Sequence, residues 1–149
     1  MALDLHLAIA HHLLIFILFG ILVSEVVLVR QSMTGGDIGR IATIDLWYGV
    51  VALVIVAVGF SRAIFAAKGW AYYSVNMFFW AKIGTFALIA VLSIWPTVKY
   101  LVWRRTFQTA NALPEAAAIT TVRRILWAEV ILFALLPAFA AAMARGYGQ

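Results

Sequence analysis

Residues 5–30 read LHLAIAHHLLIFILFGILVSEVVLVR, and this is the stretch that decides the fold. A bilayer-spanning helix needs roughly 20 largely apolar residues, and the stretch is long enough to meet that requirement. It also contains all three histidines of the chain and Glu25. Ionisable side chains are costly in lipid and usually face protein or water. The stretch therefore predicts a membrane helix with one side turned toward a protein interior.

The composition of the whole chain agrees with a membrane protein. The 149 residues are 66% hydrophobic and 11% charged, and the mean hydropathy of +1.03 lies outside the range of soluble domains. The chain has no cysteine, which excludes disulfides, thiolate metal sites, iron-sulfur clusters and covalently attached c-type haem. The net charge is +5, but the basic residues lie at the ends of apolar runs. That placement favours anchoring at a membrane face over nucleic-acid binding.

Four segments are apolar enough to span the membrane, at about residues 5–29, 41–67, 75–102 and 115–143. The connections between them are short, and glycines in residues 31–40 and 68–74 favour tight turns between antiparallel neighbours. No Lys or Arg precedes the first apolar run, so we do not expect a cleaved signal peptide. The sequence predicts an all-α single domain over residues 1–149, an antiparallel, up-down bundle of four transmembrane helices.

The orientation follows from the positive-inside rule. Basic residues are more frequent around the first and third connections than around the second connection and the C-terminus. The first group is Arg30, Arg40, Lys99, Arg104, Arg105, Arg123 and Arg124, and the second is Arg62, Lys68 and Arg145. Because Lys and Arg accumulate on the cytoplasmic side, the sequence predicts a multi-pass protein of the bacterial inner membrane with both termini periplasmic.

The polar residues within the spans form two layers in this topology. The inner, cytoplasmic layer contains Glu25, Arg30, Asp45, Arg123, Arg124 and Glu129. On a single helix, side chains meet at spacings of three or four, whereas Glu25 and Arg30 are five residues apart and Arg123 and Glu129 are six apart. We therefore expect structural ion pairs between helices. A proton path or an anion site is the alternative.

The outer layer contains the candidate cofactor-binding residues, which are His11, His12, Arg62, Asn76 and Lys82. Buried cations need a carboxylate, an anionic ligand or neutralisation, and Asp4 is the one carboxylate predicted at this depth. A single helix chelates a metal through histidines four residues apart, and the histidines here do not have that spacing. His11 or His12 remains a candidate metal ligand as one axial ligand of haem iron. Histidines that merely lie at the interface are the alternative.

The order of several motifs resembles a family of small predicted bacterial membrane proteins with four spans and no assigned function. The matching runs extend over essentially the whole chain and include HHLLIFILFG, SEVVLVR, RIATIDLWYG, YYSVN, FWAK, SIWPT and VRRILWAEV. A more distant similarity is to the HemJ-type protoporphyrinogen oxidases and related haem-binding four-helix membrane proteins. Those have an early histidine, an arginine at the far end of the first helix and a lysine in a later helix. His11 or His12, Arg30 and Lys82 match these positions, and the resemblance implies haem b as cofactor.

These observations lead to one functional hypothesis and two alternatives. The hypothesis is a membrane redox protein that binds b-type haem or a porphyrin, with His11 or His12 as axial ligand and with Arg62 and Lys82 holding propionates. The alternatives are a non-catalytic accessory subunit of a larger membrane complex and a small oligomeric transporter. The expected partners are the lipid bilayer and either further copies of the chain or other subunits, and not nucleic acid. The sequence leaves open whether the protein is an enzyme.

Overall fold

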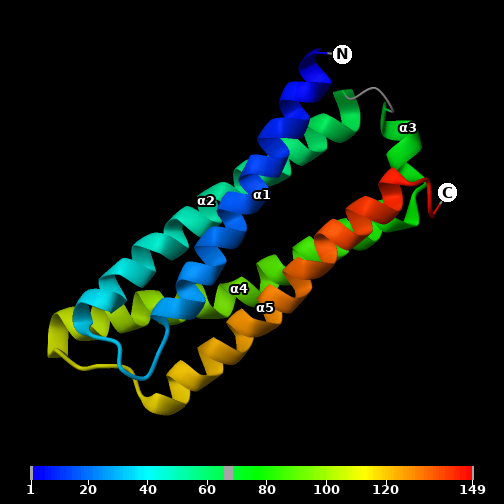
Figure 1. The fold of residues 1–149 in the computed structure, drawn as a ribbon. Helices are drawn as coiled ribbons and strands as arrows, with labels where there is room; N and C mark the ends of the chain where they lie inside the picture. Colours follow the sequence, from blue (N-terminus) through cyan, green and yellow to red (C-terminus); the bar gives the residue numbers. More distant parts are fainter. Residues whose placement is uncertain (1, 66–68, 149) are drawn as a thin grey trace.

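Five helices make up the protein in a computed structural model that describes residues 2–65 and 69–148 (Figure 1). They are α1 (Ala2–Leu28), α2 (Gly35–Phe65), α3 (Gly69–Ser74), α4 (Met77–Ala110) and α5 (Ala116–Ala144). The four long helices are each apolar and long enough to cross a membrane, and α3 is a short connecting helix. The predicted all-α fold with four spans is confirmed.

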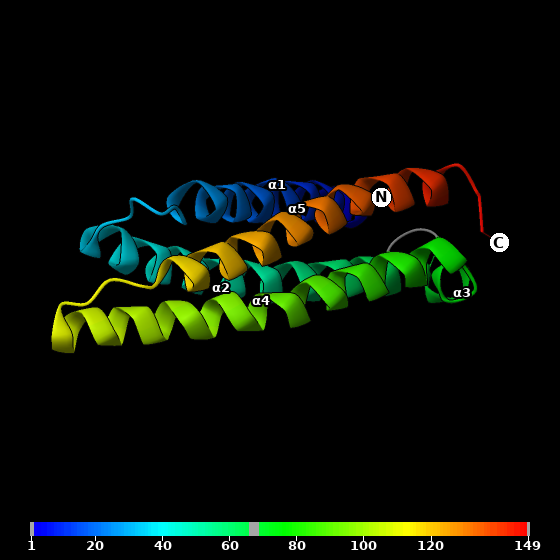
Figure 2. The ribbon, with the colours of Figure 1, turned by 90° about the horizontal axis from the view of Figure 1, so that it is seen from below.

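The long helices form two antiparallel hairpins. Helix α1 packs mainly on α2 and α4 packs mainly on α5, and the two hairpins meet through α2 against α4 and α1 against α5. In a view turned by 90° from that of Figure 1, α1 and α5 lie in one layer and α2 and α4 in the other (Figure 2). Both termini and α3 lie at the same end of the bundle (Figure 1). We call this the terminal end, and the opposite one the loop end.

The tightly packed core belongs mostly to the loop-end half of the bundle. Leu18 and Leu22 of α1, Ile41 of α2 and Val122 and Leu126 of α5 are all at most 1% exposed. Helices α1, α2 and α5 therefore bury aliphatic residues against their neighbours, whereas most of the residues that α4 buries are aromatic. Close packing of such side chains holds helices together in lipid. The terminal half contains fewer fully buried residues, and the cavity described below lies there.

Two helix ends lie well outside the bounds expected from hydropathy. Helix α2 begins at Gly35 and not near residue 41, because Thr34 and Asp37 cap it reciprocally. The Thr34 amide donates to Asp37 Oδ2 at 2.8 Å, and the Asp37 amide donates to Thr34 Oγ1 at 3.4 Å. Helix α4 continues to Ala110 and not to residue 102. It ends where Asn111 adopts φ 50° and its amide donates to the Phe107 carbonyl at 2.9 Å.

The early start of α2 brings its first turn against the last turns of α4. A Cβ atom on Gly35 would overlap the Phe107 ring, whereas one on Gly36 would meet only Thr34 Oγ1, at 3.7 Å. The absence of a side chain at Gly35 therefore permits this contact. The expected end of the second helix at residue 67 and the basic residue Lys68 both lie outside the described residues.

Candidate functional site

A large cavity lies between the two hairpins in the terminal half. Its volume is about 880 Å³, and residues from all five helices line it. Aliphatic and aromatic side chains form most of the wall, and four basic side chains contribute to it: His11, His12, Arg62 and Lys82. The structure therefore brings together four of the five residues that the sequence identified as candidate cofactor ligands.

Some of the side chains that line the cavity are exposed at the outside of the bundle and others are buried. Phe16 of α1 and Phe60 of α2 belong to the lining, and they are 71% and 40% exposed. Phe133 and Leu136 of α5 are buried and close its inner side. A site of this size, apolar with a few polar groups, has the character of a small-molecule or cofactor pocket.

The two histidines differ in what their ring nitrogens contact. His12 Nδ1 lies 2.6 Å from the Ala8 carbonyl oxygen. A carbonyl oxygen can only accept, so Nδ1 carries the proton and Nε2 of a neutral ring has a free lone pair. His11 packs on Gly59, where an added Cβ would lie 3.2 Å from His11 Cε1. The buried His11 Nδ1 has no hydrogen-bond partner among the described residues.

The positive charge of the cavity is only partly compensated. Arg62 Nε lies 3.9 Å from Asp4 Oδ1, which is an ion pair but is too long for a hydrogen bond. Both atoms are buried without a hydrogen-bond partner in the described parts of the chain. Lys82 Nζ lies 5.7 Å from the centre of the Phe79 ring and has no carboxylate within ion-pair distance among residues 2–65 and 69–148. The cavity thus suits an apolar ligand with negatively charged groups.

Asn76, the fifth candidate, does not line the cavity and has a structural position instead. It is the N-cap of α4, and its Oδ1 accepts from the amides of Phe78 at 3.0 Å and Phe79 at 3.2 Å. Its Nδ2 donates to the Tyr147 carbonyl at 3.0 Å. The residue is completely buried, so its hydrogen bonds join the start of α4 to the C-terminal segment.

Among the described residues, the carboxyl groups of the inner layer do not form the ion pairs that the sequence predicted. Glu25, Asp45 and Glu129 are 2%, 8% and 1% exposed, and none has an arginine or lysine within ion-pair distance in the described part of the chain. Each accepts a hydrogen bond from a hydroxyl group of α4 instead. The pairs are Tyr100 with Glu25 Oε2 at 3.2 Å, Thr97 with Asp45 Oδ1 at 2.9 Å, and Ser93 with Glu129 Oε2 at 3.1 Å.

The arginines of this layer bind elsewhere. Arg123 donates to the carbonyl oxygens of Val26 at 3.1 Å and Val29 at 2.6 Å, where the end of α1 leaves carbonyl groups without helical partners. Arg30 lies 3.8 Å from Asp37 Oδ2, and its side chain is half exposed. Arg124 is exposed and makes no hydrogen bond or ion pair with the described residues. The arginines thus serve helix ends and the surface.

The hydroxyl residues of α4 were not identified from the sequence. Ser93, Thr97 and Tyr100 are spaced by four and three, which places them on one face of a helix. That spacing within SIWPTVKY was the available indication. Tyr48 of α2, which is buried, adds a fourth hydroxyl group near Ser93. Polar residues on a shared face of a membrane helix are the expected partners of buried carboxyl groups.

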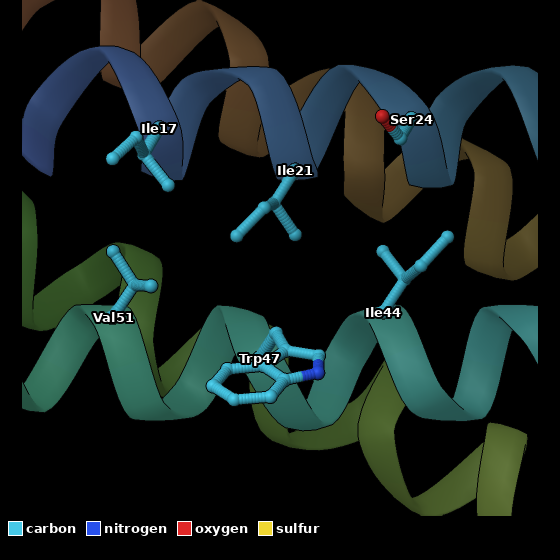
Figure 3. Close-up of a pocket in the computed structure, with 6 residues that line it drawn as sticks. All are labelled: Ile17, Ile21, Ser24, Ile44, Trp47 and Val51. Carbon is cyan, nitrogen blue, oxygen red and sulfur yellow. The ribbon is translucent and has the colours of Figure 1, made fainter.

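A second hollow, of about 340 Å³, lies between α1 and α2 (Figure 3). Ile17, Ile21, Ile44, Trp47 and Val51 line it together with one polar residue. That residue is Ser24, whose hydroxyl donates to the Gly20 carbonyl at 2.8 Å. The hollow has fewer polar groups than the larger cavity and no charged one in its lining, so the larger cavity is the stronger candidate site.

Four long apolar helices, with buried polar groups and a cavity between them, define an integral membrane protein of the helical-bundle class. Within this class, the chain belongs to the family described as "Predicted membrane protein (DUF2214)", whose pattern matches residues 3–148. No curated protein matches the chain, and no solved structure does. The similarity to the HemJ-type oxidases is not found by these comparisons.

Proposed function

We propose that the protein binds b-type haem or a related porphyrin in the cavity and acts as a membrane redox protein. The observation that carries the proposal is that His11, His12, Arg62 and Lys82 line one cavity of about 880 Å³. A porphyrin combines a large apolar face with two carboxylates, and the cavity combines apolar walls with cations that lack sufficient counter-charge. Bound haem would supply one-electron chemistry.

The described residues fit such a group in two respects. A histidine that ligates a metal usually donates its other ring nitrogen to a carbonyl or carboxylate, which fixes the ring and its tautomer. His12 has this arrangement through Ala8, so His12 is the residue that would hold the haem iron. No group of three His, Asp or Glu residues among those described could hold a metal ion by itself, which favours a metal delivered within a macrocycle over one chelated by side chains.

The two remaining cations would hold the carboxylates. Arg62 has a buried Nε without a hydrogen-bond partner in the described chain, and Lys82 approaches from the opposite hairpin. Hydrogen bonds between charged groups contribute about 1.5–3 kcal/mol, which corresponds to roughly tenfold to hundredfold in affinity. His11, held against Gly59, would limit how the ligand moves along the α1 wall.

The test is reconstitution of the purified protein with haem. We expect a Soret absorption band from the wild-type protein and its loss in the H11A/H12A double variant. His6→Ala is the matched control on the same helix, because His6 is exposed and does not line the cavity. A wild-type protein that stays colourless with haem supplied, or a band that persists in the double variant, would refute the proposal.

The roles of the two other cations are tested with the dimethyl ester of haem, which lacks the negative charges. R62Q and K82Q should each weaken binding of haem by roughly tenfold or more and leave binding of the ester nearly unchanged. Equal losses for haem and its ester would show that these residues act through packing and not through the carboxylates.

We infer in addition that the protein lies in the bacterial inner membrane with both termini on the periplasmic side. The support is the distribution of Lys and Arg between the two ends of the bundle. Because the chain has no cysteine, single cysteines can be introduced without background. In intact cells, a membrane-impermeant thiol reagent should label S74C at the terminal end and spare A112C at the loop end, and the reverse result would overturn the orientation.

A further inference from the structure

The loop-end half of the bundle contains a second group of polar residues that the proposed function does not use. Glu25 from α1, Asp45 from α2 and Glu129 from α5 converge between the helices and face the hydroxyl stripe of α4. We call these three residues the carboxyl cluster. Each is more than nine-tenths buried. The cluster is unusual because its three helices are all apolar enough to span a membrane.

The carboxyl cluster has no cation to balance it. In the described chain no Lys or Arg lies within ion-pair distance of its three members, and the neighbouring Arg123 is bound to the carbonyls at the end of α1. The three carboxyl groups contact Ser93, Thr97 and Tyr100, which follow one another along one face of α4 within about two helical turns, so they lie near one another. Placing three negative charges together in a medium of low dielectric constant is strongly unfavourable, so the geometry requires bound positive charge.

Two buried oxygen atoms show where such charge can bind. Glu25 Oε1 and Glu129 Oε1 are both buried and have no hydrogen-bond partner among the residues described. Their other oxygens accept from Tyr100 and Ser93. An unpaired buried acceptor is costly, and a proton on that oxygen turns it into a donor. No group of three acidic or histidine side chains in residues 2–65 and 69–148 has a geometry that could hold a metal ion.

From this arrangement we propose that Glu25, Asp45 and Glu129 form an intramembrane proton-binding site whose members exchange protons as one unit. The ionisable groups that face it are Tyr48 on α2 and Tyr100 on α4, besides the three carboxyl groups themselves. Hydroxyl groups both donate and accept, so Ser93, Thr97 and Tyr100 can bond to the protonated or the ionised form of the carboxyl groups that they contact. This site is independent of the cavity ligand.

Infrared spectroscopy of the full chain in lipid nanodiscs tests the proposal. With glutamate labelled by ¹³C at the side-chain carboxyl, the wild-type protein at neutral pH should show a protonated carboxyl stretch that shifts with the label and in D₂O. The band should lose intensity in E25Q or E129Q and keep it in E115Q, because Glu115 is an exposed residue at the N-cap of α5. The wild-type measurement needs no variant to fold.

Two results would overturn the proposal. One is the absence of a protonated carboxyl band at neutral pH, which would mean that all three groups are ionised. The other is a band in E129Q that disappears at the same pH as in the wild type, because members of one proton-sharing unit must titrate together. A band that disappears at a different pH in E129Q would support coupling between the two glutamates.

Discussion

Replacing Asn76 by alanine should destabilise the bundle and leave the lining of the cavity unchanged, because Asn76 is not part of that lining. The substitution removes the cap acceptor for the amides of Phe78 and Phe79 and the donor to Tyr147. Loss of an N-cap costs about 1 kcal/mol, and loss of the second hydrogen bond costs about another 1 kcal/mol. The total of about 2 kcal/mol corresponds to a roughly thirtyfold larger unfolded population. Unfolding by SDS in mixed micelles, followed by tryptophan fluorescence, measures it.

Serine separates the two contributions, because a serine hydroxyl caps a helix nearly as well as an asparagine but is too short to replace the amide donor. N76S should therefore lose about half as much stability as N76A, about 1 kcal/mol. When residues 147–149 are deleted, N76S should have little further effect, since the acceptor at Tyr147 is gone. Equal stability of N76A and wild type, or the same N76S effect with and without the C-terminal segment, would refute the reasoning.

Two further variants test helix ends at the loop end, each with a matched control and both read in the same unfolding assay. G35A should destabilise the protein by about 1–3 kcal/mol, because the added methyl group would overlap the Phe107 ring. G36A should have little effect, since its methyl group would lie 3.7 Å from the nearest atom, Thr34 Oγ1. Equal effects of the two substitutions would contradict the tight contact at Gly35. R123M should cost about 2–4 kcal/mol, because it leaves the carbonyls of Val26 and Val29 without their donor. R124M on the exposed side should be nearly neutral. A neutral R123M would show that other groups satisfy those carbonyls.

The four spans were predictable because hydropathy over 20 or more residues dominates any local preference in lipid. The ends were not, because they depend on specific hydrogen bonds. Gly35 and Gly36 suggested a turn, yet Thr34 and Asp37 cap the start of α2 at this point. In the same way, the polar residues after position 102 did not end α4, which continues to Ala110 and is capped by Asn111. Helix capping, and not the loss of hydrophobicity, sets these boundaries.

The sequence predicted the depth of the polar residues in the membrane, but it did not predict which groups they contact. Sorting polar residues by depth placed His11, His12, Arg62 and Lys82 in one layer, and the structure places these four along one cavity. The same sorting could not show that Arg123 would bind backbone carbonyls, which leaves the carboxyl groups to the hydroxyls of α4. Charge alone favoured arginine for the carboxyl groups, but the partner of a buried group is decided by which helix faces it.

The seam between the two hairpins has a consequence for how the protein is made. Thr97 and Tyr100 belong to the second hairpin, and the carboxyl groups that they contact belong to the first. Each hairpin can enter the membrane as an independent insertion unit, but its polar groups find these partners only after the two halves dock. Two co-expressed fragments, divided between α2 and α4, should accordingly reassemble in the bilayer. Hydrogen bonds between their polar side chains would direct the pairing of two surfaces that are otherwise apolar.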